Sequence, residues 1–255
     1  MSVIVRIGTA GWSIPKAVAA SFPGDGSQLR RFGRVLDGAE INTTFSRHHR
    51  PATFERWATE TPEDFRFSVK LPRAMTHEAR LKVSRAEVGD FVASLAGLAQ
   101  RLGALLVQLP PSLDLDAKAA RRFFRSVHAA FDGAIVCEPR HPTWFTPAAE
   151  RLLVEERIGR VAADPAKPEG AGAPGGWLGE QGDGRGAMVY YRWHGAPRMY
   201  WSAYDDDWLA ARALELTRWP SGTDVWCIFD NTASGAAADD ALRLRRLLDL
   251  ADLKQ

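Results

Sequence analysis

The chain has 255 residues, 45% hydrophobic and 25% charged, which is the composition of a globular protein with a sizeable core. Its 33 Lys and Arg nearly balance its 31 Asp and Glu, so the net charge of +2 gives no electrostatic argument for binding nucleic acid or a membrane surface through the whole chain. The sequence shows no signal-peptide pattern and no apolar stretch near the ~18 residues of a membrane span, so we expect a cytoplasmic protein without a membrane partner.

Eight short runs, most of them marked by β-branched or aromatic residues, predict β-strands along the chain. They cover residues 3–9, 38–43, 65–70, 104–109, 134–138, 160–163, 188–193 and 224–230. Helical patterns lie between them, and the clearest is the stripe Val88, Phe91, Val92, Leu95, Ala99 and Leu102. Ser84, followed three residues later by Glu87, predicts a capping box in front of that helix.

The alternation of strands and helices predicts an α/β fold with a parallel sheet covered by helices. Eight repeats favour closure into a TIM-type (β/α)8 barrel, and we expect a single domain over residues 1–255. The connection 164–186 breaks the pattern, because Pro165, Pro168, Pro174 and many glycines disfavour a regular helix. We expect a rim loop in place of the sixth helix, either a lid or a plain or disordered connector.

The cysteines and the glycine patterns exclude several classes of site. Cys137 and Cys227 lie in apolar strand-like runs, which favours buried free thiols over a disulfide, and the sequence has no Cys-x-x-Cys zinc spacing. The GxxxxGK[ST] pattern is absent, and GxGxxG does not follow the first strand. Both absences argue against a nucleoside triphosphatase and a dinucleotide enzyme.

Polar residues gather where the predicted strands end, which is the face of a β/α barrel that carries the site. Because side chains alternate along a strand, a period of two selects those that point into the barrel. They are Glu40, Asn42, Ser68, Lys70, Gln108, Glu138, Tyr190, Arg192, His194 and either Asp230 or Asn231. Burying such groups unpaired costs several kcal/mol, so we expect a solvated pocket with mutual pairing. The alternative is a set of purely structural ion pairs, for example Glu40 or Glu138 with Lys70 or Arg192.

The loops after the third and fifth strands add candidates at the mouth of the barrel. His77 follows the third strand and is expected to overhang the mouth, although a loop histidine is more often plain surface. Arg140 and Trp144 follow the fifth strand, and Trp144 either covers the barrel end or stacks on a ligand ring. His48 and His49 with Arg47 and Arg50 form a cluster that we interpret as a solvated loop rather than an anion site.

A metal site is a weaker hypothesis. Glu40, Glu138, Asp164, His194 and Asp230 could converge as mixed oxygen and nitrogen ligands. No HExxH-type spacing supports this, and the nearby Lys70 and Arg192 would repel a cation. We therefore expect no metal and no other cofactor.

Eight motifs, in order along nearly the whole chain, resemble the YecE-like family, also called domain of unknown function 72. They are GTAGWS (8–13, with Trp12), EINTTF (40–45), FRFSVK (65–70), Thr76-His77, LVQLPPS (106–112), EPR (138–140) with Trp144, RWHG (192–195) and DN (230–231). The resemblance implies a β/α barrel and no established reaction. Two positions depart from the family pattern, Ile14 and Ser46, where the family usually has tyrosine, which suggests a different substrate.

We therefore expect an enzyme that acts by acid/base chemistry on a small anionic or polyhydroxylated substrate. Glu138 or Glu40 would be the base and His194 the acid, while Lys70, Arg192 and Arg140 would bind the negative group. The other substrate-binding candidates are Trp12, Asn42, His77, Gln108, Trp144, Asp230 and Asn231. One alternative is a nucleic-acid barrel using Arg47, Arg50, Trp57, Arg140, Trp144 and Trp201, which the net charge disfavours; the others are a metal-dependent hydrolase and a scaffold. The oligomeric state stays open.

Overall fold

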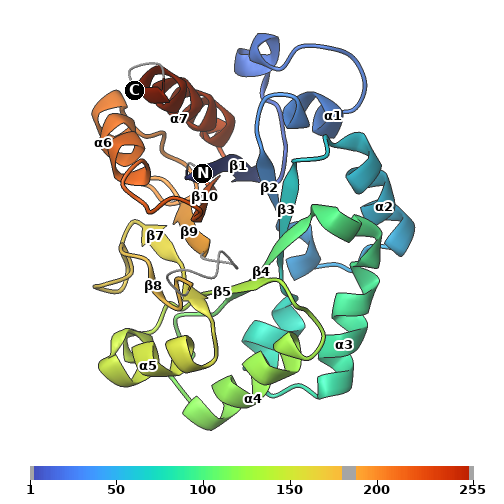
Figure 1. The fold of residues 1–255 in the computed structure, drawn as a ribbon, viewed down its shortest axis with the longest axis vertical. Coiled ribbons are helices and arrows are strands. Elements are labelled where there is room, and N and C mark those ends of the chain that lie inside the picture. Colours follow the sequence, from blue (N-terminus) through green and yellow to red (C-terminus); the bar gives the residue numbers. More distant parts are fainter. Residues whose placement is uncertain (1–2, 180–187, 253–255) are drawn as a thin grey trace.

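The strands form a sheet that curls into a barrel in the computed structural model, which describes residues 3–179 and 188–252 (Figure 1). The strands are β1 (Ile4–Ala10), β2 (Gly38–Ile41), β3 (Arg66–Lys70), β4 (Leu102–Gln108), β5 (Ala134–Glu138), β6 (Gly159–Arg160), β7 (Ala162–Asp164), β8 (Gly175–Gly176), β9 (Met188–Trp193) and β10 (Asp224–Phe229). Their order is β7-β9-β10-β1-β2-β3-β4-β5-β6-β8. Strands β6 and β7 are the two halves of the predicted sixth strand; β6 pairs with β5 and β7 with β9, both in parallel, so this stretch closes the barrel. The TIM-type prediction is confirmed.

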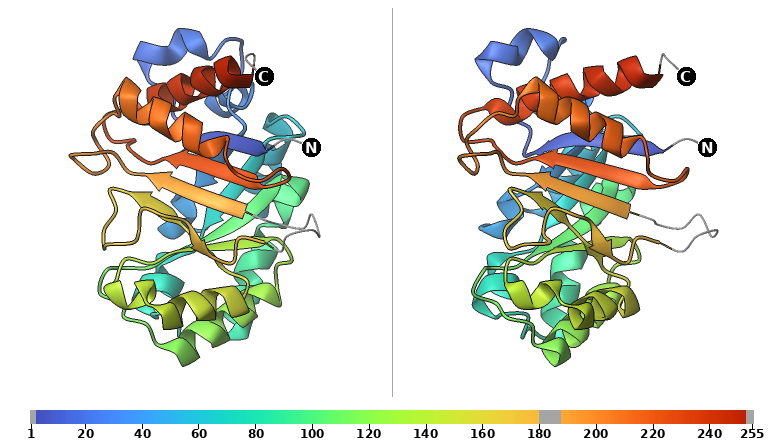
Figure 2. Two further views of the ribbon diagram at one scale, coloured as in Figure 1. Left: turned by 60° about the vertical axis from the view of Figure 1, so that its left-hand side comes forward. Right: turned by 90° about the vertical axis from the view of Figure 1, so that its left-hand side faces the viewer.

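Helices cover the outside of the barrel, as Figures 1 and 2 show. They are α1 (Gln28–Gly33), α2 (Pro51–Glu60), α3 (Arg85–Ser94), α4 (Ala117–His128), α5 (Pro147–Glu155), α6 (Asp206–Leu216) and α7 (Ala236–Asp252). The predicted capping box is present, because the Ser84 hydroxyl accepts from the Glu87 amide and the Glu87 carboxylate accepts from the Ser84 amide. No helix in the described ranges is long and apolar enough to cross a membrane.

The helix predicted from Ser84 to Leu102 is wrong in its second half. Helix α3 ends at Ser94, a 3-10 turn η4 (Ala96–Arg101) follows, and Leu102 already belongs to β4. Ala99 has a φ of 45°, which no helix accommodates. Gly97 lies so close to α2 that a Cβ there would be 2.6 Å from the Pro51 carbonyl oxygen. Packing of the chain against α2 therefore ends the helix early, although the hydrophobic period continues.

The connection after β7 carries no sixth helix within its described part. Residues 165–179 contain only β8, which pairs antiparallel with β6. Residues 180–187, the rest of the predicted rim loop, lie outside the described residues. The choice between a lid and a connector therefore stays a prediction.

The lower half of the barrel interior is apolar. The residues that fill it are Ala104, Leu106, Val136, Val161, Met188, Tyr190, Trp226 and Ile228. The Trp226 indole lies against Gly103 of β4, where a Cβ would be 2.6 Å from its Cζ2, so the absence of a side chain at Gly103 makes room for the ring. Cys137 and Cys227 are buried free thiols, as predicted. The polar residues at the strand ends lie one layer above this apolar plug.

Candidate functional site

A fully buried arginine stands at the centre of the upper layer. Arg192, near the end of β9, donates from Nε to Glu40 Oε2 (2.9 Å) and from Nη2 to Glu40 Oε1 (2.8 Å). Its Nη2 also donates to Asp230 Oδ2 (2.9 Å), and its Nη1 donates to the Glu138 carboxylate. One guanidinium thus holds three carboxylates that come from the ends of β2, β5 and β10, which gives each buried charge a partner.

The strand register explains why these side chains meet. In the sheet, Arg192 of β9 lies opposite Ile228 of β10, and Glu40 of β2 lies opposite Ser68 of β3. The side chains of Arg192 and Glu40 both point into the barrel, where they form an ion pair. Below Glu40, the Tyr190 hydroxyl donates to Glu40 Oε2 (3.2 Å) and shares a 2.6 Å hydrogen bond with Ser68 Oγ. The alternation used for the prediction therefore brings the charged groups into one layer above tyrosine and serine.

The cluster shifts the pKa of two of its acids, Glu138 and Asp230, downward. Burial raises the pKa of Glu138, but the charges of Arg192, His194 and Arg140 outweigh burial and hold the pKa well below its usual range. For Asp230 burial also opposes ionisation, and Arg192 with His194 lowers the pKa below its ordinary value. Both carboxyl groups are therefore ionised at neutral pH and are weak bases.

His194 lies between two of these carboxylates. Its Nδ1 is 3.0 Å from Asp230 Oδ2, and its Nε2 is 3.4 Å from Glu138 Oε1, an ion-pair distance without hydrogen-bond geometry. Burial lowers the pKa of His194, but the charge of Glu138 and the hydrogen bond that the imidazole donates to Asp230 raise it above 6.5. His194 is only 1% exposed, so the predicted proton donor lies beneath the surface of the barrel mouth.

Two cations mark the edge of the cluster. Arg140 donates from Nε to Glu138 Oε1 (2.7 Å) and from Nη1 to the Tyr200 hydroxyl (3.0 Å). Lys70, at the end of β3, has no hydrogen bond or ion pair from its ammonium group to any described residue, and its Nζ lies 4.1 Å from the Phe45 ring centroid. Burial, then the charge of Arg192, lowers the pKa of Lys70 to about 8, although three carboxylates oppose the shift.

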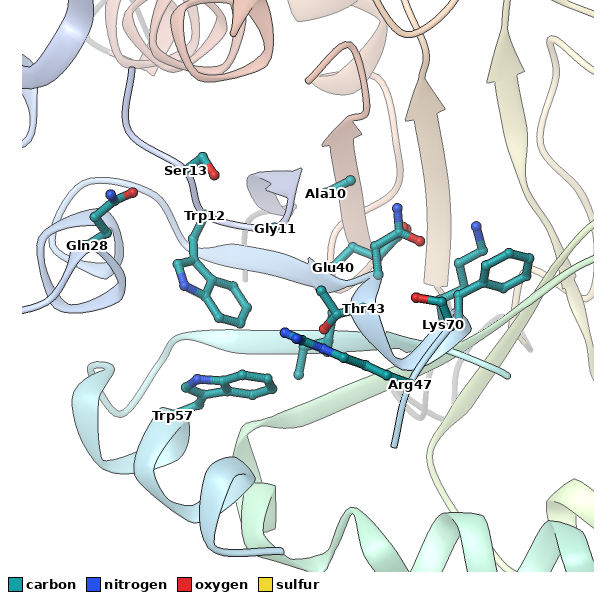
Figure 3. A pocket seen from close by; sticks show the side chains of 14 residues that line it. Ala10, Gly11, Trp12, Ser13, Gln28, Glu40, Thr43, Arg47, Trp57 and Lys70 are labelled. Carbon is teal, nitrogen blue, oxygen red and sulfur yellow. The ribbon is translucent and has the colours of Figure 1, made fainter. Parts of the chain in front are cut away.

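A pocket of about 800 Å³ opens beside Lys70, on the β1–β3 side of the mouth (Figure 3). Its lining residues are Ala10, Gly11, Trp12, Ser13, Gln28, Glu40, Ile41, Asn42, Thr43, Phe45, Ser46, Arg47, Trp57 and Lys70. Trp12 and Trp57 meet edge to face, with ring centroids 4.9 Å apart, and form one apolar wall. Arg47 extends beside Trp57, and Lys70 lies at the opposite end of the pocket (Figure 3).

The β2 connection builds most of this pocket. The strand ends at Ile41, two residues earlier than predicted, because the chain turns at once into η2 (Thr43–Phe45). Thr44 secures the turn, since its Oγ1 donates to the carbonyls of Ile41 (2.8 Å) and Lys70 (2.7 Å). The turn places Asn42 and Phe45 on the pocket wall. Sequence reasoning missed Phe45, because a single aromatic after a strand carries no signal of its own.

The remaining predicted residues divide between the mouth and the core. His77 lies at the mouth, with its ring centroid 4.9 Å from that of Phe45, and burial followed by the charges of Lys70, Arg73 and Arg140 lowers its pKa to about 4. Gln108 is buried opposite Glu138 in the register of β4 and β5.

Two predicted residues have structural contacts instead. Asn231 is fully buried, and its Nδ2 donates to Asp240 Oδ2 (2.7 Å) and the Ser202 carbonyl (2.9 Å). Trp144 is 1% exposed, and its Nε1 donates to the Leu113 carbonyl (3.0 Å). The indole of Trp144 is thus a core side chain and does not line the pocket.

The proposed metal ligands have other partners. Within residues 3–179 and 188–252, no group of three or more His, Cys, Asp or Glu side chains is arranged to hold a metal ion. Glu40, Glu138 and Asp230 surround Arg192, and the Asp164 carboxylate accepts from the Tyr204 hydroxyl (2.7 Å). A cation among the first three would have to displace the guanidinium.

The family model and the similar proteins place the chain in the same family. Residues 6–255 match the family described as Protein of unknown function DUF72. The chain is 30% identical to the UPF0759 protein YecE of Escherichia coli K12 over 177 residues, 67% of this chain and 62% of that protein, so it spans under two thirds of this relative. It is 25% identical to the UPF0759 protein YunF of Bacillus subtilis 168 over 97% of this chain and 95% of that protein.

Solved structures agree on the fold. A DUF72 family protein of Enterococcus faecalis V583 matches with a TM-score of 0.77 at 20% identity, over 96% of both chains. A DUF72 family protein of Thermotoga maritima MSB8 matches with a TM-score of 0.73 at 22% identity, over 96% of this chain and 99% of that chain. The 3-keto-D-glucoside 4-epimerase YcjR of E. coli matches with a TM-score of 0.50 at 12% identity, over 96% and 99%. At these identities the likeness concerns the barrel alone.

Proposed function

The chain belongs to the DUF72 family of proteins of unknown function, and from its geometry we propose that it is an enzyme acting on a small anionic, polyhydroxylated molecule by acid/base chemistry. The substrate would occupy the pocket between Trp12 and Lys70. One observation carries the proposal: Lys70 lines the pocket, and its ammonium group, which lies over the Phe45 ring, has no hydrogen-bond or ion-pair partner within the described chain. A buried lysine without a hydrogen-bond or ion-pair partner is costly, and an anionic ligand would offset that cost.

The charge balance around Lys70 supports an anionic substrate. When His194 is protonated, the cluster contains four cationic groups and three carboxylates. The cations are Lys70, Arg140, Arg192 and His194, and the carboxylates belong to Glu40, Glu138 and Asp230. The surplus of one positive charge lies on Lys70, because the other cations contact carboxylates. Arg47, at the far side of the pocket, adds a second positive group.

The pocket walls suit a hydroxylated molecule. Ser13, Gln28, Asn42, Thr43 and Ser46 bring hydroxyl and amide groups to the lining, and the two tryptophans supply an apolar wall of the kind that sugar rings contact. Ser46 is one of the two positions where the chain departs from the family pattern, so this wall is where substrate preference would differ.

The roles of acid and base follow the pKa directions. Lys70, with a pKa of about 8, is the described group at the pocket that would exchange a proton near neutral pH. Glu40, which lines the pocket, and Glu138 are the suggested bases, and His194 is the suggested acid. The two carboxylates also influence Lys70, because their charges raise its pKa. Of the aromatic residues named for the nucleic-acid alternative, Trp144 is 1% exposed and cannot stack on a base, whereas Trp201 is 46% exposed. The near-balanced charge of the whole chain still disfavours that alternative.

Binding of matched polyols tests the proposal. In isothermal titration calorimetry we expect gluconate or glycerol 3-phosphate to bind, and sorbitol and glycerol to bind at least tenfold more weakly. Lys70→Met should abolish anion binding, and Lys118→Met, on the exposed face of α4, should not. If no compound in a wider panel of sugar acids and sugar phosphates binds, or if Lys70→Met leaves binding unchanged, the proposal is wrong.

A further inference from the structure

We propose that Lys70 is a nucleophile that forms an imine with an aldehyde or ketone group of the substrate. This inference rests on the proposed function, since it assumes that the substrate enters the same pocket. It goes further by naming the substrate as a carbonyl compound and by predicting a covalent intermediate. Three features of Lys70 support it: its access to the pocket, its lack of an ion-pair partner and its chemical environment.

The position of Nζ suits attack on a bound molecule. Lys70 belongs to the pocket lining, while its side chain is only 7% exposed overall, so the amine is reached through the pocket and not from the bulk surface. The Phe45 ring covers one side of Nζ at 4.1 Å. No carboxylate of the described chain lies within ion-pair distance to fix the ammonium group, in contrast to Arg192 with three.

The surroundings also favour the neutral amine, which is the reactive form. Burial and the charge of Arg192 make the ammonium form less stable than it is in water. A desolvated lysine beside another cation is an established way to prepare an amine for attack on a carbonyl. At neutral pH about a tenth of a lysine with a pKa near 8 is unprotonated, compared with under a thousandth for a lysine in water.

The step balances without a cofactor. The Nζ lone pair forms a bond to the carbonyl carbon, and one amine proton passes to the carbonyl oxygen, giving a carbinolamine. The nitrogen lone pair then forms the C=N bond as the C–O bond breaks, and the departing hydroxyl takes one proton from solvent and leaves as water. The second amine proton stays on the nitrogen, so the product is a protonated imine. The buried carboxylates Glu40, Glu138 and Asp230 would stabilise the protonated imine, because each already favours a positive charge at Lys70.

The other lysines provide an internal standard. The sequence contains six lysines, at positions 16, 70, 82, 118, 167 and 254. Those at 16, 82, 118 and 167 are exposed, and Lys254 lies outside the described residues. Selective modification at position 70 would therefore reflect the pocket and not general amine reactivity.

Reductive trapping tests the inference. The full chain is incubated at pH 7.5 with sodium cyanoborohydride and either dihydroxyacetone phosphate or dihydroxyacetone, and the adducts are located by peptide mass spectrometry. We expect one adduct per chain, at Lys70, with the phosphate ester reacting at least tenfold faster than the neutral ketone. Modification spread over the exposed lysines with none at Lys70 would overturn the inference.

Two variants separate this inference from the proposed function. Lys70→Arg keeps the positive charge but cannot form an imine, so it should bind glycerol 3-phosphate and give no adduct from dihydroxyacetone phosphate. Lys70→Met should lose both, and its circular dichroism spectrum checks that it is folded. If the wild type binds glycerol 3-phosphate but neither carbonyl compound is trapped at Lys70, the imine is wrong and the anion pocket stands. If neither binding nor trapping occurs, both proposals are wrong.

Discussion

Arg192 and Glu40, which are 152 positions apart in sequence, form a two-point ion pair with hydrogen bonds of 2.9 and 2.8 Å, and both side chains are fully buried. The same guanidinium contacts Glu138 and Asp230. Because one cation serves three acids, its removal would leave all three unpaired in the barrel. The polar layer therefore depends on Arg192 more than on any single carboxylate.

Arg192→Met should destabilise the protein by about 3–5 kcal/mol at pH 7, the range for breaking a buried ion pair. The deficit should shrink as the pH falls towards 4. In the variant, the unpaired buried carboxylates have raised pKa values, so they take up protons on folding and the variant gains stability as the pH falls. In the wild type, Glu138 and Asp230 have lowered pKa values, so the stability that they provide is lost as the pH falls. Urea unfolding at several pH values measures both effects.

The control for this prediction is Arg80→Met. Arg80 contacts Asp114 at 3.2 Å, but the two side chains are 41% and 68% exposed, so its loss should cost under about 1 kcal/mol. A deficit for Arg192→Met that is equally small would show that the buried cluster is far less tightly coupled than its geometry indicates.

Glu138→Gln should lower the pKa of His194. The charge of Glu138 is the largest factor that raises this pKa against burial, and glutamine removes it. In the wild type the imidazole should titrate above 6.5, and in the variant below the wild-type value, as followed by NMR of the ring protons. Asp114→Asn, at the surface, should leave the titration unchanged. A wild-type His194 that titrates below 6.5 would contradict the assignment.

Lys70→Met should stabilise the protein at pH 7 and progressively less above pH 8. A pKa lowered from 10.5 to about 8 corresponds to a penalty of about 3 kcal/mol. The penalty is complete below pH 8. As the pH rises from 8 to 10.5, the unfolded chain still binds the proton that the folded chain has lost, so the wild type gains stability relative to the variant. Paired urea titrations at pH 7 and pH 10 measure the difference, and Lys118→Met should show no such trend.

Gly103→Ala should cost about 1–3 kcal/mol, because the new Cβ would lie 2.6 Å from Trp226 Cζ2 in the apolar plug. Gly89→Ala, in α3, is the matched control. Nothing lies within 4 Å of its Cβ position, so alanine should stabilise the helix by roughly 0.5–1 kcal/mol. Thermal unfolding should show a lower melting temperature for Gly103→Ala and a higher one for Gly89→Ala than for the wild type. Equal changes in the two variants would mean that the apolar plug repacks around the extra methyl group.

The sequence by itself determined the barrel and the direction of its side chains. Strand period and strand number depend on local patterning, so the alternation that points Lys70, Glu138 and Arg192 inward can be read without coordinates. The Ser84 capping box is local for the same reason. Where local pattern and packing disagree, as at Ala99, packing against α2 decided the outcome.

Only the tertiary structure decided which of the inward charges are paired. Barrel closure brings Glu40, Glu138 and Asp230 within reach of one guanidinium and leaves Lys70 facing the pocket, a distribution that depends on distances of a few ångströms between distant segments. The same closure places Trp144 in the core and lets the turn after β2 form the pocket wall with Phe45. Side-chain direction is a property of each strand, whereas pairing and solvent access arise only when all the strands are assembled.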